Sequence, residues 1–268
     1  LDKNIPFTIT QYSSKQGLPQ SQVNDIVSKK NGELIVATAN GIVIFNGNEF
    51  REITQDPRQK NFINSEIFWN EKYQILISRG EKNHPYVIYP QLKALGSYEA
   101  FTAIRDSFYC MDESGKIFGA DFKDLALKEI VTTSLRDPNC FYPSGNTVFV
   151  GKDDGLYKYN ILNNASVKLY DGTFTKIMFS ETTNKIYALS TKTLYELTNS
   201  FQPVFTLANE KREDLCFDFE IIDSLTMFIA TTNGLYEIND GEQDYYSKKS
   251  SLPSASLYSL YYNKYEDA

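Results

Sequence analysis

The chain has 268 residues, with 27 Lys and Arg against 34 Asp and Glu, which gives a formal net charge of −7. An acidic surface repels a phosphate backbone, so binding of nucleic acid by this domain is excluded. The single histidine, His84, excludes metal centres that need several imidazoles, and we expect neither a metal nor a cofactor.

The cysteines and the apolar runs limit the chain further. Cys110, Cys140 and Cys216 are odd in number and far apart, which predicts buried thiols rather than a disulfide framework or a metal site. No apolar run approaches the ~20 residues of a membrane-spanning helix, and the first residues lack the apolar core of a signal peptide. The chain is therefore either cytosolic or has lost a targeting segment.

Short apolar segments separated by Gly and Asn turns fill the first part of the chain. Turns are expected at Gly32, Asn40-Gly41 and Asn46-Gly47, because Asn and Gly tolerate positive φ. These turns predict four short strands, at residues 22–27, 33–37, 42–45 and 50–53. Nothing supports a long amphipathic helix, and the best candidate, residues 121–128, is expected to be a turn.

This pattern repeats along the chain about every 40 residues. A polar turn leading into a short strand marks each copy, and a degenerate copy lies within residues 79–89. The same four-strand pattern returns in residues 174–207 and 216–247. The marker positions are Gly41, Gly155 and Gly234 in the clearest copies, and Gly115 and Thr193 in two weaker ones.

Four-stranded antiparallel units of this length are typical of a β-propeller. A second marker, Gly17-Leu18-Pro19 near the start and Ser251-Leu252-Pro253 near the end, lies six such steps apart. A seventh unit would then begin near residue 252 and supply only its first strand, residues 257–262, whereas residues 7–12 read as an outer strand. We therefore expect one all-β propeller domain over residues 1–268, seven-bladed, with an incomplete last blade in a truncated chain.

The first repeat carries Gly, apolar and aromatic residues at a fixed spacing: Gly17, Leu18, Pro19, Val23, Ile26, Gly32, Leu34, Val36, Thr38, Gly41, Ile42, Phe45, Gly47 and Phe50. In these residues it resembles the two-component regulator propeller repeat. It departs from that pattern at three positions, with Ile35 in place of Trp, Ala37 in place of Gly and Lys29 in place of Asp.

The resemblance implies a role rather than a reaction. Such propellers are similar to the extracytoplasmic sensor regions of Bacteroidetes hybrid two-component systems, the periplasmic parts of inner-membrane proteins. They precede further sensor domains and a histidine kinase of the same protein, and their ligands are often oligosaccharides. We accordingly expect the N-terminal part of a non-catalytic, ligand-sensing region that responds to an oligosaccharide and can form a homodimer.

The candidate ligand residues lie in loops that a propeller gathers on one rim, between the second and third strands and between blades. A ring mixing Arg, Lys and carboxylates could hold a sugar acid or a sulfate through charge-assisted hydrogen bonds. The alternative is that these are ordinary polar loop residues. The candidates are Arg79, Arg136, Lys152, Asp153, Asp154, Lys192 and Arg212, within a set that also includes Asn40, Asp137, Asp171 and Asn233.

Two other classes of function stay open on the sequence. A protein-interaction scaffold would use the same ring without a small ligand, and a propeller lyase or glycosidase would need catalytic groups. Asp153-Asp154 is the most acidic pair, but adjacent turn residues point in different directions and turn formation explains them. His84 lacks a G-x-S-x-G nucleophile elbow, so no catalytic residue is assigned.

Overall fold

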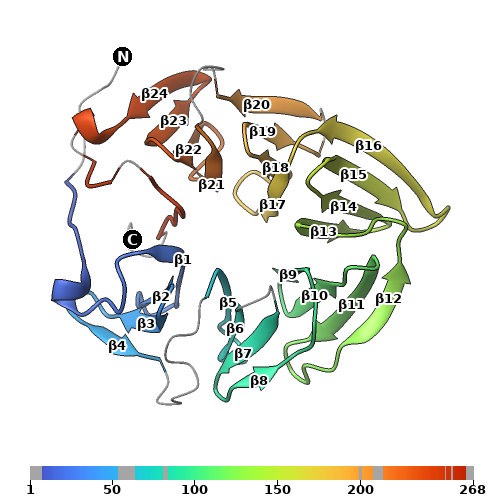
Figure 1. The fold of residues 1–268 in the computed structure, drawn as a ribbon, viewed down its shortest axis with the longest axis horizontal. Coiled ribbons are helices and arrows are strands. Elements are labelled where there is room, and N and C mark those ends of the chain that lie inside the picture. Colours follow the sequence, from blue (N-terminus) through green and yellow to red (C-terminus); the bar gives the residue numbers. More distant parts are fainter. Residues whose placement is uncertain are drawn as a thin grey trace.

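The computed structural model describes residues 8–53, 64–80, 84–198, 201–207, 214–250, 252–254 and 256–263. Within this part of the chain, 24 strands form six sheets of four antiparallel strands each. The sheets stand as blades around a common axis (Figure 1), and the strands of each blade pair in chain order from the axis outward. The predicted all-β propeller of four-stranded antiparallel blades is therefore confirmed for six blades.

The six blades have the following strands. Blade 1 contains β1 (Val23–Ser28), β2 (Leu34–Thr38), β3 (Gly41–Phe45) and β4 (Phe50–Glu52), and blade 2 contains β5 (Glu66–Asn70), β6 (Ile75–Arg79), β7 (Pro85–Tyr89) and β8 (Lys93–Ala94). Blade 3 contains β9 (Ala100–Ile104), β10 (Ser107–Met111), β11 (Lys116–Asp121) and β12 (Lys128–Thr132), and blade 4 contains β13 (Cys140–Ser144), β14 (Thr147–Gly151), β15 (Gly155–Asn160) and β16 (Ala165–Asp171). Blade 5 contains β17 (Phe174–Ser180), β18 (Lys185–Ser190), β19 (Thr193–Glu196) and β20 (Gln202–Thr206), and blade 6 contains β21 (Cys216–Ile221), β22 (Thr226–Thr231), β23 (Leu235–Asn239) and β24 (Glu242–Tyr246).

The marker of the sequence repeat is the turn between the second and third strands of a blade. In blade 6, the Thr231 hydroxyl donates to the Gly234 carbonyl at 2.9 Å and accepts the Asn233 amide at 3.3 Å. Thr38 makes the same pair of bonds in blade 1. A Cβ on Gly234 would lie 2.2 Å from the Tyr246 carbonyl oxygen, so glycine lets the fourth strand approach closely.

Apolar clusters fill each of the five interfaces between consecutive blades. Between blades 5 and 6, for example, Leu194 and Phe205 pack against Phe219 and Ile229, and none of the four is more than 2% exposed. A blade buries both of its faces in this way, which is why its strands are apolar on both sides rather than alternating. Cys110 and Cys216 lie in these clusters, as predicted, and burial raises the pKa of both thiols.

The segment after β24 returns to the axis between blades 6 and 1 (Figure 1). The Leu257 amide donates to the Thr231 carbonyl at 3.0 Å, and the Leu260 amide donates to the Asp218 carboxylate at 3.0 Å. On the other side, the Tyr261 hydroxyl is hydrogen-bonded to Ser28 of β1. Residues 256–263 thus connect the last blade to the first, and we call them the closing segment.

Candidate functional site

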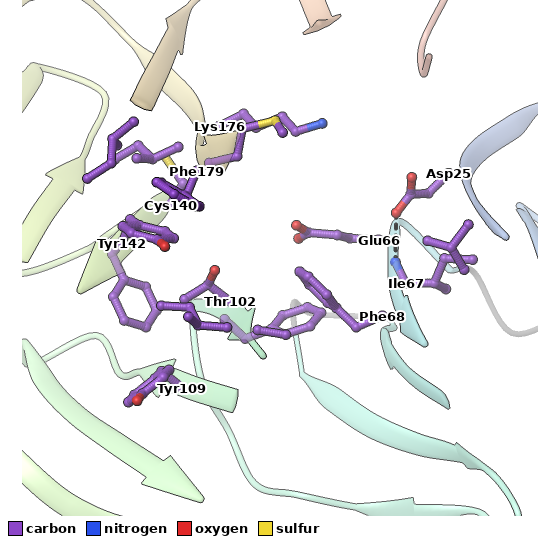
Figure 2. Close-up of a pocket in the computed structure, with 18 of the residues that line it drawn as sticks. Asp25, Glu66, Ile67, Phe68, Thr102, Tyr109, Cys140, Tyr142, Lys176 and Phe179 are labelled. Carbon is purple, nitrogen blue, oxygen red and sulfur yellow. Dashed lines mark hydrogen bonds between the residues drawn. The ribbon is translucent and has the colours of Figure 1, made fainter. Parts of the chain in front are cut away.

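A cavity of about 1280 Å³ follows the axis of the ring. The innermost strands β1, β5, β9, β13 and β17 supply most of its lining, together with Leu260 and Tyr261 of the closing segment. Figure 2 shows Glu66, Thr102, Tyr142 and Lys176 around this space, which we call the channel.

Three of the innermost strands carry an irregularity at the same place near their start. The pairing of β1 with β2 shifts register between Val23 and Asp25, and β17 and β21 shift in the same way just before Lys176 and Asp218. The first strands of blades 2, 3 and 4 pair without such a shift. A bulge re-aims the side chain that follows it, and here the three re-aimed side chains are all charged.

We call these three side chains, Asp25, Lys176 and Asp218, the charged belt. Asp25 and Lys176 line one half of the channel, and Asp218 is buried beside Lys176. The Lys176 ammonium is paired with the Asp218 carboxylate of the next blade. Asp218 also accepts the amides of Phe219 and Leu260, at 2.8 and 3.0 Å. The belt therefore links blade 5 to blade 6 and blade 6 to the closing segment.

Asp25 continues the belt from blade 1 to blade 2. One carboxylate oxygen accepts the Ile67 amide of β5 at 2.8 Å, and the other accepts the Ile26 amide at 2.8 Å (Figure 2). The Ser259 hydroxyl of the closing segment lies 3.5 Å from the second oxygen. A charged side chain on each bulged strand thus bonds the segment that follows it around the ring: β21 for Lys176, the closing segment for Asp218 and β5 for Asp25.

Burial and charge act against each other in the belt. Burial alone would lower the pKa of Lys176, but the carboxylates of Asp218 and Asp25 outweigh it and raise that pKa, so Lys176 stays charged. Burial raises the pKa of Asp25 from its ordinary value of 3.8 to about 7, and the attraction of Lys176 offsets only part of this effect. Asp25 therefore titrates near neutral pH.

The opposite half of the channel has hydroxyl groups that no described residue bonds. Thr102 of β9 and Tyr142 of β13 are only 7% and 8% exposed, and both line the channel. Neither hydroxyl has a hydrogen-bond partner among the described residues, and the same holds for Tyr109. None of these hydroxyl oxygens is among the buried polar atoms that lack a partner, so they are open to the channel, where water or a ligand can hydrogen-bond to them.

Glu66 projects into the same half of the channel (Figure 2). Its carboxylate lies 3.8 Å from Nε of Arg79, and its side chain is 34% exposed. Phe68 and Phe179 add aromatic surface, and burial raises the pKa of the nearby Cys140 thiol, which keeps it protonated. The channel combines hydroxyls, a carboxylate and aromatic faces, and it has no thiolate nucleophile.

Of the residues predicted from sequence, Arg79 is the one that lines the channel. Lys192 lies on the rim, where its ammonium donates to the Asp214 carbonyl of the next blade. Arg136 lies exposed in the connection between blades 3 and 4, and Arg212 falls outside the described residues.

The other three candidates share the loop between β14 and β15. Asp154 accepts a hydrogen bond from the Tyr157 hydroxyl at 2.6 Å, and it lies 3.9 Å from the Lys152 ammonium. Asp153 accepts the Asn139 side-chain amide at 2.8 Å. Each of these groups has a partner within the rim of blade 4, so the loop is held by its own contacts.

Sequence reasoning missed Glu66, Thr102 and Tyr142. Each lies in an innermost strand, whose sequence is apolar or mixed, whereas the residues predicted as ligands lie in polar turns. The sequence does mark the innermost strands in another way. A charged residue, Asp25, Lys176 or Asp218, interrupts the otherwise apolar first strand of blades 1, 5 and 6. A charge at the same place in several repeats indicates a shared environment, here the innermost strands of the ring.

Two further observations concern the described residues as a whole. None of the helices among them is long and apolar enough to cross a membrane. No group of three or more His, Cys, Asp or Glu side chains in that part of the chain is placed to hold a metal ion.

Comparison with known proteins gives matches in structure rather than in sequence. No protein-family model matches the chain, and no curated protein matches it. The extracellular domain of the hybrid two-component system BT3049 from B. thetaiotaomicron superposes with a TM-score of 0.71 at 15% identity, covering 94% of this chain and 38% of that one. The extracellular domain of BT4673 from the same organism gives 0.68 at 11% identity, covering 90% and 35%.

The propeller fold is thus shared with these extracellular domains, and this chain spans little more than a third of their length. A computationally designed protein, Ika8, also matches, with a TM-score of 0.51 at 14% identity over 85% of this chain and 71% of its own. At such identities the likeness concerns the fold alone.

The titration of Asp25 predicts a pH-dependent stability. Between about pH 4 and pH 7 the unfolded chain has lost this proton while the folded protein retains it, so the free energy of unfolding decreases as the pH rises through that window. Asp25→Asn should remove this part of the slope, measured by urea unfolding across the window.

Asp223→Asn is the matched control. Backbone amides of Leu225 and Thr226 lower the pKa of Asp223, so its contribution is lost only as the pH falls below the window. The two slopes should therefore differ. Equal slopes in wild type and Asp25→Asn would contradict the assigned role of Asp25.

Proposed function

We propose that this chain is a non-catalytic, ligand-sensing propeller in the extracytoplasmic part of a two-component signalling protein, and that it responds to an oligosaccharide. The observation that carries the proposal is the channel, in which the hydroxyls of Thr102, Tyr109 and Tyr142 make no hydrogen bond to any described residue and lie beside aromatic side chains. Sugars offer both hydrogen-bonding groups and apolar ring faces, which such a surface complements. The shared fold with extracellular domains of two-component systems supports the cellular role.

The proposed mechanism is a shift in population. A ligand in the channel contacts the first strands of several blades at once, so it favours one arrangement of the ring over others. Downstream sensor and kinase domains of the same protein, or a second copy of it, would transmit that preference. A ligand that binds both arrangements with equal affinity would not change their populations and would produce no signal.

We further propose that residues 1–268 form one domain whose ring has seven blades. The closing segment supports this, because its bonds from Leu257 and Leu260 to blade 6 repeat those from Asn64 and Ile67 to blade 1. A groove of about 770 Å³ separates it from residues 19–23 on the N-terminal side. Two strands supplied by a continuation of the chain would fill this groove, with residues 8–12 as the outermost strand.

The seventh blade is tested by hydrogen exchange. In a longer chain that includes the following 40 or so residues, the amides of the closing segment should become more protected, because a second strand would pair with it. Leu260, already bonded to Asp218, serves as the internal reference. Unchanged exchange throughout the segment would contradict a seventh blade.

Ligand sensing is tested by thermal unfolding in the presence of a panel of glycan oligosaccharides. A ligand that binds only the folded state stabilises it by about 2.7 kcal/mol at a hundredfold excess over Kd. We expect a selective rise in Tm with one class of glycan, reduced in Tyr142→Phe, which removes only the hydroxyl that faces the channel.

Asp154→Asn, on the rim, is the control and should respond like wild type. If the ligand-induced rise in Tm is lost in Asp154→Asn but kept in Tyr142→Phe, the ligand binds at the rim loops and not in the channel. A well-folded protein that responds to no glycan would contradict sensing and favour the interaction scaffold, and turnover of a polysaccharide would contradict the non-catalytic assignment.

A further inference from the structure

Most charged side chains that line the channel are matched by an opposite charge. Among the described residues, however, the guanidinium of Arg105 makes no hydrogen bond and no ion pair, although Arg105 lines the channel. The matched pairs are Lys176 with Asp218, Arg79 with Glu66, and Asp106 with Lys72. Arg105 is therefore the channel-lining cation in that part of the chain that is free to bind a ligand.

Arg105 lies in the short turn between β9 and β10, and the turn itself does not require an arginine. Its φ is 55°, in the left-handed region that favours glycine, and Gly145 stands at the same place in the turn between β13 and β14. The backbone of the turn is held from blade 2, because the Asn70 side-chain amide donates to the Arg105 carbonyl at 3.3 Å. The turn is thus fixed in position, while no described residue bonds the arginine side chain.

The hydroxyls of Tyr109 and Tyr142 line the same channel (Figure 2). Burial raises the pKa of Tyr142, and the positive charge of Arg105 acts against that rise, so the guanidinium lies near this hydroxyl. Tyr109 acts electrostatically on the same hydroxyl, which brings all three groups to one part of the channel wall. A guanidinium beside hydroxyl donors can bind a carboxylate or a sulfate through charge-assisted hydrogen bonds.

The carboxylates of the channel do not oppose an anion at this place. Glu66 is the first residue of β5, whereas Asn70, which bonds the Arg105 carbonyl, is the last, so about 13 Å of extended strand separates them. Asp106, next to Arg105, is already paired. Glu181 lines the channel from the turn between β17 and β18, two blades away.

We infer that Arg105, together with the hydroxyls of Tyr109 and Tyr142, forms a subsite for an acidic group of the glycan, a carboxylate or a sulfate. This inference rests on the proposed function, since it names the class of ligand for the same site. It places recognition of the acidic group inside the channel, at the end where β9 turns into β10, rather than at the basic rim residues expected from the sequence.

The test uses pairs of oligosaccharides that differ only in charge, compared by isothermal titration calorimetry. Galactose oligomers are compared with galacturonate oligomers of the same length, and N-acetylglucosamine oligomers with their sulfated forms. Within the series that binds, we expect the acidic member to bind about tenfold or more tightly than its neutral counterpart. The two series distinguish a carboxylate from a sulfate as the group that is bound.

Arg105→Gln should abolish that preference by weakening the binding of the acidic member, with little change for the neutral one. Glutamine fits the turn, since Gln74 has a φ of 52° between the first two strands of blade 2. Arg105→Lys keeps the charge and should retain part of the preference. Arg136→Gln is the matched control, because it removes an exposed arginine from the rim and should bind both members like wild type.

Equal or tighter binding of the neutral member by wild type would overturn the inference while leaving sensing intact. A preference that survives in Arg105→Gln would overturn the role of Arg105, and its loss in Arg136→Gln would place the acidic group at the rim. No binding by any neutral or acidic member would refute the proposed function, and this inference with it.

Discussion

The ion pair between Lys176 and Asp218 is the interaction on which the arrangement of the channel depends. It joins two blades through the side chains that follow their bulges, and Asp218 extends the connection by accepting the Leu260 amide of the closing segment. Asp25 does the same from blade 1 to blade 2. The Asp218 side chain is buried, with 7% of its surface exposed, so removal of Lys176 would leave a buried carboxylate without its partner and destabilise the ring.

The bulges divide the ring into two halves with different properties. In blades 1, 5 and 6 a charged side chain is turned to bond the next innermost strand, and its hydrogen-bonding capacity is used within the protein. In blades 2, 3 and 4 the first strand pairs regularly, and side chains such as Thr102 and Tyr142 face the channel with free hydroxyls. One half therefore holds the ring together, while the other is available to a ligand.

The sequence predicted the repeat and the blade well because both depend on local chemistry. The turn at Thr231 and Gly234 needs a hydroxyl, and it needs a glycine where the fourth strand comes close, so these residue types recur at the same step. The channel could not be located in the same way. Whether Asp25 faces the channel or solvent depends on a one-residue shift of pairing at Val23, and a sequence does not show such a shift.

The candidate rim residues also show that residue type can be predicted from the sequence when the surroundings of the side chain cannot. Asp153 and Asp154 are polar turn residues, as the sequence suggested, but they are bonded to Asn139 and Tyr157 within one blade. Glu66 was not predicted from the sequence, yet the closure of the ring brings it to the same channel as Thr102 and Tyr142 (Figure 2). The long-range geometry, rather than the polarity of a segment, decides which side chains share a site.

The location of bound glycan is the most direct test of this account, and hydrogen exchange by mass spectrometry measures it. With a binding oligosaccharide, we predict increased protection in peptides from β5, β9 and β13, whose side chains line the channel, and little change in the loops at 136–137, 152–154 and 191–192. Protection confined to those loops, with the innermost strands unchanged, would contradict the channel as the binding site.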